Sequence, residues 1–334
     1  MASTSTLEQF NVFFKKYSRF IALAVALVLP LFLSPRWVHT FIVAFYYMIV
    51  ALSWNLCAGY TGQFSFGHHA FSAVGAYAAG LLAYYYGLPP AAGIIVGGIA
   101  AVPIGFVLGG VSLRTRGPYL ALTTWAFAEC LNIVLRNEYE ITGGTKGLLI
   151  PTLFPRGTSK LYYYYVGLFL FAVVLILVYK LVKSRIGLYM AAIRDDVDVA
   201  EAMGVDTVKW KVLVFTFSSF LAGLGGAFYA YYIGLISPSL ATMGEMVMVM
   251  IIVLFGGMGT LEGTIIGGIF IMLISEFLRG IMPGISLLFF SAVIIILIRF
   301  FRGGLIELIR KLIAGFSSSP SVAETGMKNI SVEG

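Results

Sequence analysis

The chain has 334 residues, of which 60% are hydrophobic and only 11% are charged. Soluble domains carry about 25% charged residues, so this composition excludes a water-soluble fold and indicates an integral membrane protein. The formal net charge of +7 comes from basic residues at the ends of apolar runs, where the positive-inside rule places them, and it does not indicate nucleic-acid binding.

Ten apolar segments follow one another along the chain: 20–34, 41–58, 68–86, 91–111, 118–136, 161–180, 212–234, 245–256, 264–281 and 284–301. Runs of this kind cross a bilayer as α-helices, so we expect an all-α polytopic membrane protein with about 8–10 transmembrane helices. The chain then divides into a cytoplasmic N-terminal segment (1–19), a transmembrane domain (20–301) and a partly disordered cytoplasmic tail (302–334).

Glycine-rich phrases interrupt two of these segments. The third segment begins with GYTGQFSFGHH (59–69), and the short eighth segment ends at FGGMGTLEG (255–263). A helix needs about 20 residues to cross the hydrocarbon core, so these phrases predict broken or re-entrant helices shielded by protein or by a water-filled cavity. Five segments in each half would give the halves opposite orientation, which is the geometry of inverted five-helix repeats.

Basic residues predict the orientation of the segments. Four clusters are expected on the cytoplasmic side, and they consist of Lys15, Lys16, Arg19, Arg114, Arg116, Lys180, Lys183, Arg185, Arg299, Arg302, Arg310 and Lys311. An alternating ten-span arrangement with both termini in the cytoplasm satisfies every cluster. The loops 137–160 and 235–244 then face the outside.

One internal loop, 183–211, is unusually polar. Its ten charged residues are Lys183, Arg185, Arg194, Asp195, Asp196, Asp198, Glu201, Asp206, Lys209 and Lys211. The spacing of three between Asp195, Asp198 and Glu201 predicts one acidic face on a short helix of two to three turns, for which Gly204 is a suitable C-cap. This helix either docks on a soluble partner or is a solvated loop helix with no partner.

The loop also carries a family resemblance. AAIRDDVDVAEAMGVDTVKWKVLVFTFSSFLAGLGGAFYA (191–230) resembles a region of ATP-driven importer permeases of the branched-chain amino acid type, the LivM-like subunit. Four further phrases occur in the family's order: GYTGQFSFGHHAFSAVGAYAAG (59–80), TRGPYLALTTWAFAE (115–129), ITGGTKGL (141–148) and VLFGGMGTLEGTIIGG (253–268). The chain departs from the pattern at Phe66 and at the pair His68-His69, where the family often has a leucine and a single histidine.

The resemblance implies a subunit that transports without binding ATP. In such permeases a loop helix docks on the ATPase, and the residues implied for this coupling are Arg194, Asp195, Asp196, Asp198, Glu201, Ala202 and Gly204. The implied partners are a second related permease chain, two ATP-binding cassette subunits that hold ATP and magnesium, and an extracytoplasmic solute-binding protein, all at the plasma (inner) membrane. The implied cargo is a branched-chain or related apolar amino acid. The phosphate-binding pattern G-x-x-x-x-G-K-[ST] does not occur, and no cofactor is expected on this chain.

Candidate residues for the translocation path surround the first glycine phrase and lie in segment five: Gly59, Gln63, Ser65, His68, His69, Trp125 and Glu129. Broken helix ends at the glycines can offer backbone groups to the charged ends of an amino acid. The alternative is helix packing through small residues. Glu276 and Arg279 are expected to pair on one helix, and Cys57 and Cys130 are expected to be small core residues.

No set of residues typical of catalysis or metal binding is visible, so we do not expect an enzyme. The main rival hypothesis is an ion-coupled secondary carrier that works without an ATPase and uses Glu129 or Glu276 as an intramembrane carboxylate. A channel or a membrane scaffold that does not depend on ATP is a further alternative.

Overall fold

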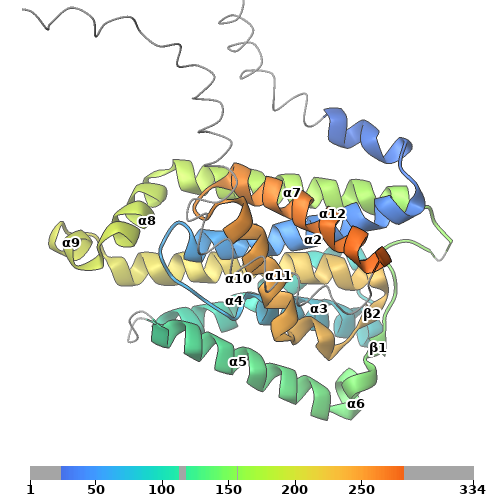
Figure 1. Cartoon of the computed structure of the whole chain (residues 1–334). Coiled ribbons are helices and arrows are strands. Elements are labelled where there is room, and N and C mark those ends of the chain that lie inside the picture. The colour runs from blue at the N-terminus through green and yellow to red at the C-terminus, as the bar shows by residue number, and fades with distance from the viewer. Residues whose placement is uncertain (1–23, 113–117, 156, 282–334) are drawn as a thin grey trace, which may run out of the picture.

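The computed structural model describes residues 24–112, 118–155 and 157–281. The segment 1–19, the tenth apolar segment and the tail 302–334 lie outside the described residues. The helices of the described part are α2 (Pro35–Ala58), α3 (His68–Tyr86), α4 (Pro90–Ser112), α5 (Pro118–Asn137), α6 (Tyr139–Thr142), α7 (Lys160–Lys183), α8 (Arg185–Asp195), α9 (Val197–Ala202), α10 (Thr207–Ile233), α11 (Met243–Gly256) and α12 (Leu261–Ile281) (Figure 1). Three 3-10 turns, η1 (Leu29–Leu31), η2 (Gly144–Lys146) and η3 (Pro238–Ala241), and two short strands, β1 (Leu148–Leu149) and β2 (Leu235–Ile236), complete the described elements.

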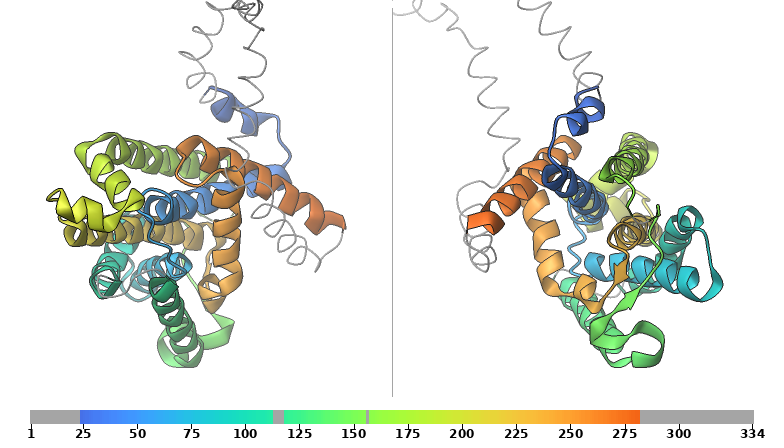
Figure 2. Two further views of the ribbon diagram at one scale, coloured as in Figure 1. Left: turned by 60° about the vertical axis from the view of Figure 1, so that its left-hand side comes forward. Right: turned by 90° about the vertical axis from the view of Figure 1, so that its right-hand side faces the viewer.

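Five of these helices are long and apolar enough to cross a membrane: Pro35–Ala58, Pro90–Val111, Lys160–Lys183, Thr207–Ile233 and Leu261–Leu278. The α11 helix is too short, with 14 residues, as the sequence predicts for segment eight. The all-α polytopic membrane fold is therefore confirmed. In the views of Figure 2, α11 runs across the direction of the long helices instead of along it.

The centre of the bundle is α10, which packs closely on α3 and α4. Close packing depends on glycine, because a β-carbon at Gly223 would lie 2.7 Å from the carbonyl oxygen of Gly97. A β-carbon at Gly226 would collide with the backbone carbonyl of Ser72. Small residues at such crossings let helix backbones approach, which is the usual way that transmembrane helices associate.

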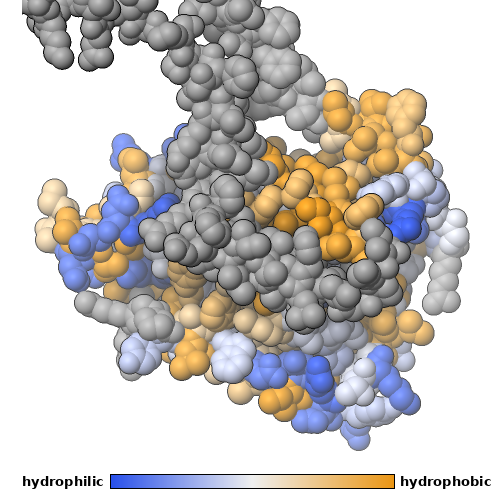
Figure 3. All heavy atoms as spheres, in the orientation of Figure 1, coloured by the Kyte–Doolittle hydropathy of each residue, from blue (hydrophilic) through white to orange (hydrophobic). Residues whose placement is uncertain are grey.

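The two ends of the bundle differ. One end carries α8 and α9, and we call it the α9 end; the other carries α6, β1 and β2, and we call it the β end (Figure 1). In Figure 3, hydrophilic residues gather toward the two ends of the molecule, with more hydrophobic residues between them. This arrangement agrees with the predicted orientation, in which the loop 183–211 lies opposite the loops 137–160 and 235–244.

Two segments without α-helix enter the bundle from opposite ends. Residues 59–67 follow α2 and lead into α3, as the first glycine phrase predicts. Residues 234–242 follow α10 and lead into α11. The second segment runs along α3, because Ile236 packs at Gly80 and Ala241 lies against His69. Gly80 and His69 are eleven residues apart on α3, or about 16 Å along a helix. Such backbone is tolerated at membrane depth because protein shields it.

Candidate functional site

The polar loop 183–211 folds as two helices instead of the single helix expected over 194–204. The break falls at Asp196, whose backbone is extended (φ −159°, ψ 118°). Its Oδ1 accepts hydrogen bonds from the backbone nitrogens of Asp198 (2.9 Å) and Val199 (3.1 Å). Aspartate is a strong N-cap and a poor residue for a helix interior, so it starts α9 where uniform spacing suggested continuation.

The α8–α9 arm is anchored firmly to the bundle. Met190 and Ile193 of α8 are buried. The ring of Tyr189 stacks on Trp210 of α10, with centroids 5.0 Å apart. The hydroxyl of Thr207 donates a 2.5 Å hydrogen bond to Glu201 Oε1, which joins the end of α9 to the start of α10. Glu201, expected to contact an ATPase, therefore also has a local structural partner.

Gly204 ends the arm in the manner that the sequence predicts. Its φ is +82°, and its nitrogen donates to the carbonyl of Glu201 (2.9 Å). The nitrogen of Val205 donates to the carbonyl of Ala200 (3.0 Å), which completes a Schellman motif.

The outer surface of α9 combines acidic and apolar side chains. Asp198 and Ala202 of α9 are exposed, as is Asp195 at the end of α8. Val199 and Met203, four residues apart on the same side, are 59% and 80% exposed. Sequence reasoning did not place these two among the site residues, although apolar residues at helical spacing in a polar loop were the available signal. Arg194 lies apart from this surface, against Gly62 and Gly259.

The predicted path residues around the first glycine phrase lie close together, but most of their polar groups already contact neighbouring side chains. His68 is buried, and its ring nitrogens lie 3.3 Å from Ser65 Oγ and 3.1 Å from Ser218 Oγ. Ser218 in turn contacts Cys57 Sγ at 3.0 Å. This chain of polar groups joins α2, α3 and α10, so His68 and Ser65 hold helices together.

Gln63 and Gly59 also have local contacts. Gln63 is buried, and Thr61 Oγ1 lies 3.5 Å from its Oε1. Gly59 lies so close to Asn55 that a β-carbon there would collide with the asparagine side chain.

His69 differs from its neighbour. It is 2% exposed and interacts with the backbone of Ala241 in the segment that descends along α3. Its Nδ1 has no hydrogen-bond partner among the described residues. His69 thus connects the first turn of α3 to the segment 234–242, just before α11 begins.

An apolar hollow of about 460 Å³ lies beside this junction. It is lined by Phe64, Phe66, Ala121, Leu122, Trp125 and Met243. Trp125 is the one predicted path residue in the lining, and Glu129 lies half-buried one helical turn further along α5. The lining suits an apolar group and offers no charged partner.

The loops 137–160 and 235–244, which the sequence predicts on the outer side, meet at the β end and form one surface. Leu148 pairs with Ile236 and Leu149 with Leu235 in an antiparallel ladder. Beside the ladder lies an open hollow of about 610 Å³, lined by Tyr84, Pro90 and residues 149–155.

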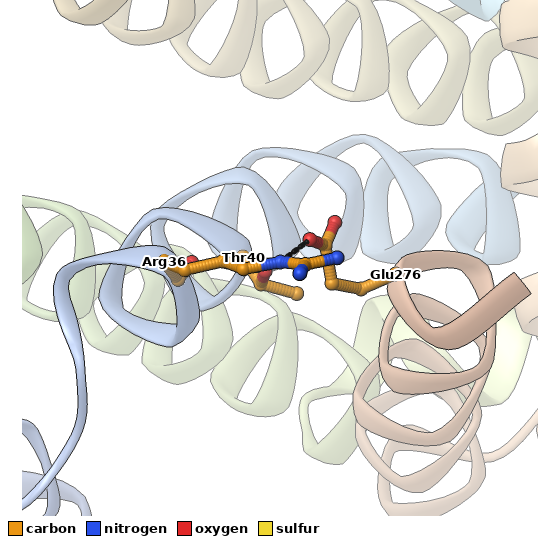
Figure 4. Close-up of polar contacts among 3 residues, drawn as sticks. All are labelled: Arg36, Thr40 and Glu276. Carbon is orange, nitrogen blue, oxygen red and sulfur yellow. Dashed lines mark hydrogen bonds and ion pairs between the residues drawn. The ribbon is translucent and has the colours of Figure 1, made fainter. Parts of the chain in front are cut away.

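The sequence prediction of a core position was wrong for Cys130, and Glu276 has a partner that the sequence did not predict. Glu276 pairs with Arg36 of α2, whose Nε lies 2.6 Å from Glu276 Oε1 (Figure 4). Helix α12 packs along α2, and this brings the guanidinium to the carboxylate. The side chain of Arg279 lies outside the described residues, so its expected pairing with Glu276 stays a prediction. Cys130 is exposed on the surface of α5, whereas Cys57 is buried as expected.

Long apolar helices, two segments without α-helix inside the bundle and a polar arm at one end define a multi-pass membrane protein of the transport permease class. A family model for the permease component of branched-chain amino acid transport systems matches residues 37–298. The chain belongs to this family.

Individual relatives agree with the family. The chain is 31% identical over 284 residues to the high-affinity branched-chain amino acid transport system permease protein LivM of Escherichia coli, covering 77% of this chain and 67% of the relative. It is 24% identical over 242 residues to the branched-chain amino acid transport system permease protein LivH of Salmonella typhimurium, covering 67% of this chain and 78% of the relative. It is 26% identical over 214 residues to the fructose import permease protein FrcC of Rhizobium meliloti, covering 60% of this chain and 59% of the relative. No solved structure matches the chain.

Proposed function

We propose that this chain is a transmembrane subunit of an ATP-binding-cassette importer that moves branched-chain or related apolar amino acids inward. ATP hydrolysis on separate subunits drives an alternation between outward-facing and inward-facing states. The similarity to LivM supports the class of cargo, because that relative is a branched-chain amino acid permease by name. The similarity to LivH, a second permease of such a system, supports a partnership between two related permease chains.

The observation that carries the proposal is the exposed surface of α9. Val199 and Met203 are apolar and largely exposed at an end of the molecule that is otherwise rich in charge. Exposed apolar side chains in a polar rim are typical of interaction sites. In this proposal α9 inserts into a groove of an ATPase subunit, with Asp195, Asp198 and Ala202 around the apolar pair and Asp196 and Gly204 fixing the shape of the arm.

The hollow at Trp125 is proposed as the place where the apolar side chain of the cargo passes. Its volume of about 460 Å³ lies within the usual range of small-molecule sites, about 300–1,000 Å³. It lies beside His69 and the starts of α3 and α11, where Gln63 and Ser65 complete the polar surroundings. A lining without charged partners holds cargo weakly, which suits passage, and leaves selection to the solute-binding protein.

The same proposal assigns the two ends. The α9 end and both termini face the cytoplasm, and the joined surface of β1 and β2 faces outward at the plasma (inner) membrane, where a solute-binding protein delivers the cargo. ATP and magnesium are bound by the partner subunits and not by this chain.

The test is affinity purification of the tagged chain from native membranes in mild detergent. We expect an ATPase to co-purify with the native chain and to be lost when Val199→Asp and Met203→Asp are combined. The control is Leu149→Asp, which introduces one aspartate at a residue 65% exposed at the β end and should retain the ATPase. Absence of an ATPase from the native chain would refute the importer assignment and favour a secondary carrier.

A further inference from the structure

We propose that Arg194 transmits the movement of the α8–α9 arm to the glycine turns inside the bundle, and that it is not part of the surface that contacts the ATPase. The inference rests on the proposed function and adds a positioning residue to it. The two turns are the α2 turn (59–63) and the α11–α12 turn (257–260). Arg194 lies in contact with both.

The contact with the α2 turn is made by the backbone and stem of Arg194. A β-carbon at Gly62 would lie 3.7 Å from Arg194 Cα and 3.9 Å from its Cγ. Gly62 has φ +71°, so the turn needs glycine for its backbone as well. The end of α8 thus rests directly on the turn that leads toward α3.

The contact with the α11–α12 turn is made by the guanidinium. A β-carbon at Gly259 would lie 2.5 Å from Arg194 Nη1 and 3.5 Å from its Cζ. The charged end of Arg194 therefore occupies the place where any other residue at position 259 would have its side chain. Gly259 (φ +77°) and Gly257 (φ +122°) shape this turn through conformations that favour glycine.

Asn55 fastens the two turns to each other. Its Nδ2 donates to the carbonyl oxygen of Thr260 (3.0 Å) and lies 2.9 Å from Thr264 Oγ1. Its Oδ1 accepts a hydrogen bond from the nitrogen of Gly259 (2.8 Å). Asn55 is fully buried at the end of α2, so a displacement of one turn acts on the other.

The arm is built to move as one piece. A single residue, Asp196, separates α8 from α9, and its side chain caps α9. Met190 and Ile193 fix α8 against the bundle on the side that precedes Arg194. A load applied at Val199 and Met203 therefore reaches Arg194 across one junction residue, Asp196, whose side chain caps α9, without a longer linker between the two helices.

Beyond the turn, the movement reaches the apolar hollow. The α11 helix starts at Met243, which lines the hollow, and ends at the α11–α12 turn. Its 14 residues cover about 21 Å, so a tilt applied at the turn displaces Met243 at the far end. Arg194 is thus placed to connect ATPase movement with the width of the path.

The experiment compares Arg194→Ala and Arg194→Lys with the native complex, reconstituted in liposomes with its ATPase and solute-binding subunits. Solute uptake and ATP hydrolysis are measured together. The control is Arg185→Ala, which removes the same exposed cation from the other end of α8. We expect Arg194→Ala to retain its ATPase subunits and to hydrolyse ATP, while solute uptake per ATP falls at least tenfold. Arg194→Lys should recover part of this ratio, and Arg185→Ala should leave it unchanged.

Two results would overturn the inference. Loss of the ATPase from the Arg194→Ala complex would make Arg194 a docking residue, and an unchanged ratio of uptake to hydrolysis would remove its role. Both results differ from a failure of the proposed function, in which the native complex itself neither contains an ATPase nor hydrolyses ATP during uptake.

Discussion

The guanidinium of Arg36 lies 2.6 Å from the carboxylate of Glu276, so the start of α2 is joined by an ion pair to α12, 240 residues later in the chain (Figure 4). Arg36 is 62% exposed and Glu276 is 12% exposed, so water screens one partner. Pairs of this kind contribute from nothing to about 1 kcal/mol. The pair fixes the relative position of two helices and gives Glu276 a structural role.

Glu276→Gln should therefore leave transport nearly intact. We expect uptake within twofold of the native protein and a loss of at most about 1 kcal/mol of stability, because a neutral amide can still accept a hydrogen bond from Arg36. Uptake in proteoliposomes and the Tm in detergent check this. A collapse of uptake that depends on an ion gradient would support the secondary carrier, in which Glu276 carries the coupling ion.

Gly204→Ala should weaken the arm through its backbone alone. A β-carbon at Gly204 meets nothing within 4 Å, so the cost comes from the left-handed conformation, on the order of 1–2 kcal/mol. The matched control is Gly87→Ala, where φ is +66° and a β-carbon also meets nothing within 4 Å. Both variants should lose similar stability by Tm, but only Gly204→Ala should lose ATPase in co-purification. Equal retention of the ATPase would show that α9 is not the docking element.

Asn55→Ala should be among the most destabilising single changes in the bundle. It removes the side-chain hydrogen bonds from Asn55 to the α11–α12 turn and leaves the part-buried nitrogen of Gly259 without this acceptor, at a cost on the order of 3 kcal/mol. Ser53→Ala is the control, because buried Ser53 donates only to the carbonyl of Val50 on its own helix (2.7 Å). Thermal unfolding of the two purified variants measures the difference. Similar Tm values would contradict the role of Asn55 as a fastening between the turns.

Trp125→Ala should change uptake with little effect on the fold. Trp125 is 42% exposed and lines the apolar hollow. Its removal therefore widens the proposed path and reduces the contact that the hollow makes with an apolar side chain of the cargo. We expect uptake to fall severalfold with the Tm nearly unchanged. Ile133→Ala, at a residue 51% exposed on the same helix and outside the lining, should match the native protein in both measurements. Equal uptake by both variants would remove the hollow from the path.

Hydrophobic segment length and the two glycine phrases were enough to predict most of the fold. The run that became α2, the short α11 and the break before α3 follow from local composition, because a bilayer leaves helices as the main way to satisfy the backbone. Gly204 was predicted as a helix stop for a similar local reason. The break at Asp196 was missed, since the spacing of Asp195, Asp198 and Glu201 fits one helix as well as two.

The sequence by itself determined a polytopic helical membrane protein, its family and the polar loop that distinguishes its α9 end, since all of these depend on composition, order and nearby spacing. Only the tertiary structure decided which distant residues meet: Arg36 with Glu276, Asn55 with Gly259, and Arg194 with both glycine turns. It also placed residues 234–242 inside the bundle, where the sequence suggested only an outer loop. These relationships arise from close packing between helices, and spacing along a single helix carries no information about its neighbours across the bundle.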